Sequence, residues 1–83
     1  MNSSKVKKAI ESKIIYMVKV IMEKENCTEA VAFKHFKTSK LYEILTDEKS
    51  GLYLEPIEFL CEAYQLEIKQ SPQEMIKYIN SGL

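Results

Sequence analysis

The side chains with the most reactive chemistry in this sequence are one histidine, His35, and two cysteines, Cys27 and Cys61. Nucleophilic catalysis by cysteine needs a nearby imidazole and a third group that orients the ring, and no diagnostic spacing indicates such a set. Structural zinc sites bring their ligands in close pairs, which these three residues do not form. The two glycines, Gly51 and Gly82, build no phosphate-binding loop. We therefore predict no catalytic, cofactor-binding or metal-binding residue and no enzymatic activity.

The lysines suggest a different chemistry, the binding of phosphate groups. Residues 28–46 can be interpreted as two short helices joined by a break, as in a helix-turn-helix. The side chains that would then lie near a DNA backbone are Lys34, His35, Lys37 and Lys40. All twelve basic residues are lysines, whereas specific base recognition relies heavily on arginine, and Glu43 lies on the would-be recognition helix. DNA binding is therefore the alternative prediction, and nucleic acid is not the partner we expect.

The charge is unevenly distributed along the chain. Twelve basic and twelve acidic residues cancel, but residues 1–42 hold nine lysines and four acids while residues 43–83 hold three lysines and eight acids. The positive half can attract an acidic partner, or the two halves can attract each other within one molecule or between two copies. The third interpretation is a lysine surface that is only solvated.

The elements that must position these side chains begin with a long N-terminal helix, for which Ser4 is the predicted cap. Ile10, Ile14, Met17 and Ile21 follow a 4-3-4 spacing that indicates one apolar seam. Apolar residues nevertheless cover more than half of the helix circumference, beyond the arc of an ordinary surface helix. The residues that we predict to form an interface on the far side of the seam are Ala9, Tyr16 and Val20. We therefore expect a homodimer, with a second protein as a further possible partner.

Capping signals divide the rest of the chain into short helices. Thr28 caps a second helix that runs to about Phe36, and Thr38 or Ser39 caps a third. Residues 52–54 are predicted to be extended, and Pro56 is predicted at the first position of a fourth helix. Ser71 and Glu74 have the spacing of a capping box before a last helix. The prediction is an all-α fold, a small bundle of four to five helices with a long N-terminal helix, in a single domain of residues 1–83.

Hydropathy and the N-terminal residues bear on the cellular compartment. The longest apolar cluster, residues 14–22, is interrupted by Lys19, so no membrane span is predicted. The first five residues lead into charged positions, which does not fit a secretory signal. We therefore expect a cytoplasmic protein with reduced cysteines.

The order of these features resembles a set of short uncharacterised bacterial helical proteins, a domain-of-unknown-function family. The resemblance covers the N-terminal helix ending at residues 21–23, the segment 30–36 and the segment 40–45 before a polar turn. It implies an intracellular helical protein of unknown role with a protein partner. Independently of this resemblance, the broad apolar surface of the first helix and the uneven charge along the chain favour a small protein–protein interaction module that self-associates.

Overall fold

Helices form nearly all of the regular structure in this computed structural model, which describes the backbone of residues 2–82 and the side chains of residues 5–81. The five α-helices are α1 (Asn2–Glu25), α2 (Glu29–Lys37), α3 (Lys40–Leu45), α4 (Ile57–Lys69) and α5 (Pro72–Gly82). Two short 3-10 turns, η1 (Glu48–Ser50) and η2 (Leu52–Leu54), connect α3 to α4. Residues 2–82 contain no strand. The predicted all-α fold with a long N-terminal helix is confirmed.

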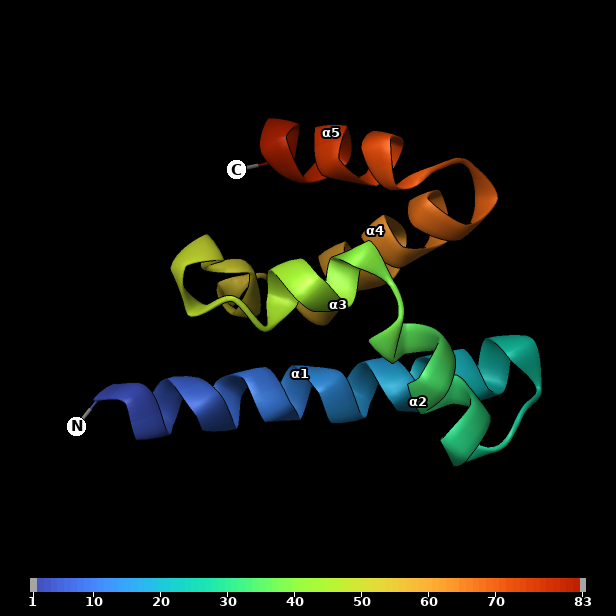
Figure 1. The fold of residues 1–83 in the computed structure, drawn as a ribbon, viewed down its shortest axis with the longest axis horizontal. Helices are drawn as coiled ribbons and strands as arrows, with labels where there is room; N and C mark the ends of the chain where they lie inside the picture. The colour runs from blue at the N-terminus through green and yellow to red at the C-terminus, as the bar shows by residue number, and fades with distance from the viewer. Residues whose placement is uncertain (1, 83) are drawn as a thin grey trace.

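The helices lie in three tiers (Figure 1). α1 runs along one edge, and α2 folds back against its C-terminal half. α3 and α4 occupy the middle, and α5 packs against α4 on the opposite edge from α1. α3 has only six residues but contacts α2, α4 and α5, so it links the two edges of the molecule.

The apolar seam of α1 enters a core to which every α-helix contributes. Met17 and Ile21 are fully buried, Ile10 is nearly so, and Ile14 is only partly buried. The fully buried side chains of the other elements are Ala32, Phe36, Leu41, Leu45, Leu52, Leu60, Ala63 and Met75. Phe36 packs edge-to-face against Tyr42 and Tyr64, with ring centroids 5.4 and 5.7 Å away. The seam predicted from the 4-3-4 spacing therefore faces the core, with Ile14 at its margin.

Short-range capping determines where α2 and α3 begin. The Thr28 hydroxyl accepts a hydrogen bond from the Val31 N–H at 3.3 Å, and the Ser39 hydroxyl accepts one from the Tyr42 N–H at 3.1 Å. Both residues have extended backbone angles, as expected of N-caps. The predicted cap at Thr28 is confirmed, and of the two candidates for α3 Ser39 is the N-cap, while Thr38 is the C-cap of α2.

The predicted capping box at the start of α5 forms only in part. The Ser71 hydroxyl accepts a hydrogen bond from the Glu74 N–H at 3.2 Å, which is one half of the box. The other half is missing because the Ser71 N–H donates to the Leu66 carbonyl at 3.2 Å, and the Glu74 carboxylate accepts from Lys77 instead. The end of α4 thus supplies the partner that the box assigns to Glu74.

Three boundaries differ from the sequence-based predictions. α1 begins at Asn2, so Ser4 lies inside the helix rather than at its cap. Pro56 is the N-cap of α4 and not its first residue. Residues 52–54 form the 3-10 turn η2 and not an extended segment, because Leu52 turns into the core and the Glu55 N–H donates to its carbonyl at 3.0 Å.

Candidate functional site

The interface residues predicted from the sequence lie on α1 with unequal exposure. Tyr16 has 57% of its surface exposed, whereas Ala9 and Val20 are only half-buried positions beside it. Tyr16 is thus free to contact a partner in the folded monomer. The remainder of the predicted face is already partly covered by the chain itself.

A second apolar surface, which we call the α1–α2 groove, lies on another side of α1. It encloses about 330 Å³ between the two helices, and its lining residues are Ile14, Ile15, Val18, Lys19, Glu29, Ala30 and Phe33. Ile15 is 58% exposed and Phe33 is 39% exposed, so two large apolar side chains meet solvent together at this hollow. No groove between these two helices was predicted from the sequence. The wide apolar arc of α1 was the sequence feature that could have predicted an exposed apolar surface on this helix.

The side chains proposed for DNA contact are mostly engaged within the protein. His35 Nδ1 lies 2.8 Å from Glu25 Oε1, and Lys40 Nζ lies 3.0 Å from Glu43 Oε2. The ammonium of Lys37 lies 6.0 Å from the centroid of the Phe33 ring, at the limit of a cation–π contact. Lys34 lies exposed in the last turn of α2.

The would-be recognition helix α3 is closed to phosphate at its N-terminus. The Lys40 N–H donates to Glu67 Oε2 at 2.7 Å, and the Leu41 N–H donates to Glu67 Oε1 at 2.9 Å. A carboxylate therefore occupies the position where a backbone phosphate would bind. Leu41 and Leu45 are fully buried, so α3 packs as a core element.

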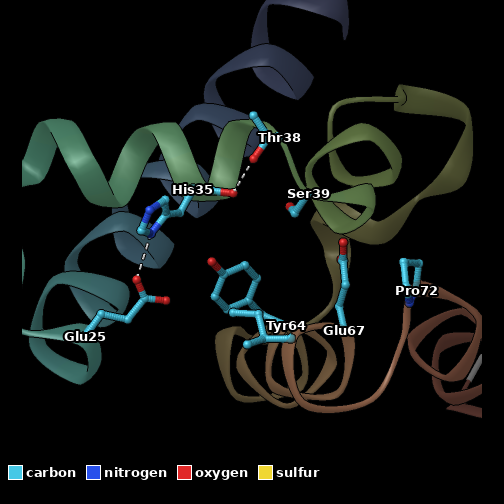
Figure 2. Close-up of a pocket in the computed structure, with 8 residues that line it drawn as sticks. Glu25, His35, Thr38, Ser39, Tyr64, Glu67 and Pro72 are labelled. Atoms are coloured by element: carbon cyan, nitrogen blue, oxygen red, sulfur yellow. Dashed lines mark hydrogen bonds and ion pairs between the residues drawn. The ribbon is translucent and has the colours of Figure 1, made fainter.

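A polar pocket of about 420 Å³ opens where the ends of α1 and α2 meet α4 and α5 (Figure 2). Its lining residues are Glu25, His35, Thr38, Ser39, Tyr64, Glu67, Ile68 and Pro72. The Thr38 hydroxyl donates to the carbonyls of Lys34 and His35, and the Ser39 hydroxyl donates to the Phe36 carbonyl at 2.6 Å. Because the backbone holds both hydroxyls, neither is presented as a nucleophile. Among residues 5–81, no three His, Cys, Asp or Glu side chains gather into a metal-binding group.

Tyr64 is the buried residue of this pocket. Its ring belongs to the core and the residue is only 3% exposed, while its hydroxyl points toward the Glu25–His35 pair, with Glu67 on the other side of the ring (Figure 2). Burial raises the pKa of Tyr64 to about 12, and the negative charges of Glu25 and Glu67 add to the rise. The hydroxyl is therefore a neutral donor and acceptor at ordinary pH.

The two cysteines take no part in the pocket or the groove. Both are half-buried free thiols, and Cys61 Sγ lies 3.8 Å from the sulfur of Met17. Burial raises the pKa of the Cys61 thiol, the positive charge of Lys24 opposes this rise, and the charges of Glu58 and Glu62 add to it. The thiolate, which is the nucleophilic form, is thus disfavoured at Cys61.

Comparison of the chain with protein-family models, with curated proteins and with solved structures finds no match. The resemblance to short bacterial helical proteins therefore stays a prediction. In the described part of the chain, none of the helices combines the length and the apolar character needed to cross a lipid bilayer.

Proposed function

We propose that this protein is a small helical interaction module that pairs with a second copy of itself through the α1–α2 groove. The observation that supports this proposal is an open, largely apolar groove whose walls include the exposed side chains of Ile15 and Phe33. Exposed apolar patches of this kind mark interaction surfaces, because covering them removes apolar area from water.

The size of the molecular surface is consistent with a missing partner. The protein exposes 5593 Å², against about 5,100 Å² expected for a folded monomer of 9.7 kDa. A dimer of standard size buries about 800 Å² on each partner, roughly one seventh of this surface. α1 alone has 24 residues and thus a length of about 36 Å, which is long enough to carry such an interface.

The charges at the rim of the groove favour a second copy over an unrelated partner. Lys19 on α1 and Glu29 on α2 line the groove with opposite charges, and neither forms an ion pair within residues 5–81. In a two-fold dimer every contact between two different residues occurs twice, once in each direction. Two copies can therefore pair Lys19 of one chain with Glu29 of the other, twice, around an apolar centre.

The test is sedimentation of the full chain at tens of micromolar with three variants. We expect a wild-type dimer, a monomer for Ile15→Glu, and an unchanged dimer for the control Leu54→Glu, since Leu54 is 74% exposed on η2 and does not line the groove. Tyr16→Glu with Val20→Glu examines the face predicted from the sequence. A monomeric wild type contradicts the proposal. A dimeric Ile15→Glu variant would show that the interface lies outside the groove.

A charge exchange examines the identity of the partner. Lys19→Glu should weaken the dimer because it opposes Glu29 of the other copy, and Lys19→Glu with Glu29→Lys should restore it. Exposed ion pairs contribute only about 0.2–1 kcal/mol each, so we expect changes of a few-fold in the dissociation constant. Restoration by the double exchange is the result specific to a pairing of two identical chains.

DNA binding remains the alternative proposal, and it has less support. Lys34 alone of the four proposed contacts has no partner described above, and Glu67 occupies the N-terminus of α3. Adding duplex DNA at low salt to the sedimentation experiment tests this alternative, because phosphate contacts make binding fall as salt rises. A salt-sensitive complex with duplex DNA would favour it.

A further inference from the structure

The Tyr64 hydroxyl is a polar group on an almost completely buried residue, and the structure gives it no protein partner. No hydrogen bond from residues 5–81 reaches it, yet it is not sealed from solvent, because the described residues include no buried polar side-chain atom without a partner. The small exposed part of Tyr64 therefore includes its hydroxyl, which faces the polar pocket (Figure 2). Because no group in residues 5–81 engages this hydroxyl and it faces the pocket, it is available to a ligand there.

The charged groups around that hydroxyl favour a cation. Glu25 and Glu67 line the pocket, and both raise the pKa of Tyr64 through their negative charge. No lysine lines the pocket, and His35 is already paired with Glu25. The positive end of α3 offers no site for an anion, because Glu67 accepts hydrogen bonds from its first two N–H groups.

The geometry distinguishes between kinds of cation. A guanidinium binds most strongly to a carboxylate that offers both oxygens to its planar fork, but His35 already engages one oxygen of Glu25 and the N–H groups of α3 engage both oxygens of Glu67. An ammonium is a point charge with three donors, so it can use the free oxygen of Glu25 and the Tyr64 hydroxyl together. Ile68 and Pro72 supply apolar wall for an alkyl chain that carries the ammonium.

We propose that the polar pocket binds a primary alkylammonium group, with Tyr64 and Glu25 as its direct contacts and Glu67 as a second negative charge. The two sources of this chemistry are a free alkylamine and a lysine side chain. This site is separate from the α1–α2 groove, so the proposal stands or falls independently of self-association.

The test is a titration of the full chain followed by NMR at the Tyr64 ring and the His35 imidazole. The probes are n-butylammonium chloride and Nα-acetyl-lysine methylamide. n-Butanol serves as the neutral isostere and sodium chloride as the ionic-strength control. We expect saturable shifts with both ammonium probes at roughly millimolar concentration, because exposed ionic contacts are weak. Tighter binding of the lysine derivative would identify a side chain as the source, and equal binding would identify the amine itself.

Matched variants decide whether the proposed contacts are responsible. Tyr64→Phe keeps the core ring and removes only the hydroxyl, and Glu25→Gln removes a charge. The controls are Tyr53→Phe, which alters another tyrosine, and Glu23→Gln, which alters an exposed acid on α1. Each pocket variant should weaken ammonium binding about fivefold to tenfold, and the controls should not. Equal shifts with n-butanol or sodium chloride, or unchanged binding in Glu25→Gln, would overturn the proposal even if Tyr64→Phe did not fold.

Discussion

Tyr64 has two physical roles, because its ring and its hydroxyl lie in different surroundings. The ring packs edge-to-face against Phe36 in the core, while the hydroxyl faces the polar pocket on the side of Glu25 and His35. This division is typical of tyrosine, whose body is apolar and whose tip is polar. The protonation state of the Tyr64 hydroxyl therefore affects both the polar pocket and the stability of the core.

The raised pKa of Tyr64 predicts a loss of stability in alkaline solution. The group titrates near its ordinary pKa of 10 in the unfolded chain and at about 12 in the folded protein. Between these values the folded state holds a proton that the unfolded state has released, so the free energy of unfolding falls as the pH rises. Below pH 10 the contribution is fully present. Urea unfolding of wild type and Tyr64→Phe across pH 9–12 measures this, and equal slopes for both chains would contradict the prediction.

At the scale of elements, α3 is a helix that cannot form by itself. Six residues give too few internal hydrogen bonds to offset the cost of nucleation. Its first turn is completed from outside, by the Ser39 hydroxyl and by the Glu67 carboxylate of α4. Glu67 thus joins α3 to α4 with two charge-assisted hydrogen bonds.

We predict that Glu67→Gln destabilises the protein by about 1–3 kcal/mol, since a neutral amide with one acceptor oxygen replaces a carboxylate that accepts two bonds. Amide hydrogen exchange at Lys40 and Leu41 should accelerate more than exchange in α1. The matched control is Glu62→Gln, which changes an exposed acid on the same helix and should have little effect. If both variants unfold at the same denaturant concentration as wild type, the carboxylate contributes nothing to α3.

At the scale of the whole molecule, one core joins all five helices, and the depth of a residue in that core determines the cost of truncating it. Met17 is fully buried at the centre of α1 and lies 3.8 Å from the thiol of Cys61. Ile14 belongs to the same seam but also lines the α1–α2 groove. A domain of this size has a total stability of only about 4–12 kcal/mol.

We predict that Met17→Ala costs about 2–5 kcal/mol, because it leaves a cavity that the packed helices cannot fill. Ile14→Ala should cost less, since its side chain already borders solvent at the groove. Chemical denaturation of the two variants at a concentration low enough to keep each chain monomeric checks this order. A loss for Ile14→Ala as large as that for Met17→Ala in the monomer would contradict this order.

The sequence alone determined the features that depend on neighbouring residues. The apolar spacing of residues 10–21 predicted the buried seam of α1, and Thr28 and Ser39 predicted the starts of α2 and α3. Ser71 predicted the start of α5. These predictions succeed because helical periodicity and side-chain capping act over three or four residues. The fold class follows from the same short-range patterns.

Only the tertiary structure decided which surfaces remain open and which distant groups meet. It left Ile15 and Phe33 exposed at a groove, and it supplied Leu66 as the partner of the Ser71 N–H in place of Glu74. It also brought the carboxylate of Glu67 to the start of α3, 26 and 27 residues away in the chain. The physical reason is that a helix with apolar residues around most of its circumference can bury any of several faces. The side that it buries depends on the positions of the other helices.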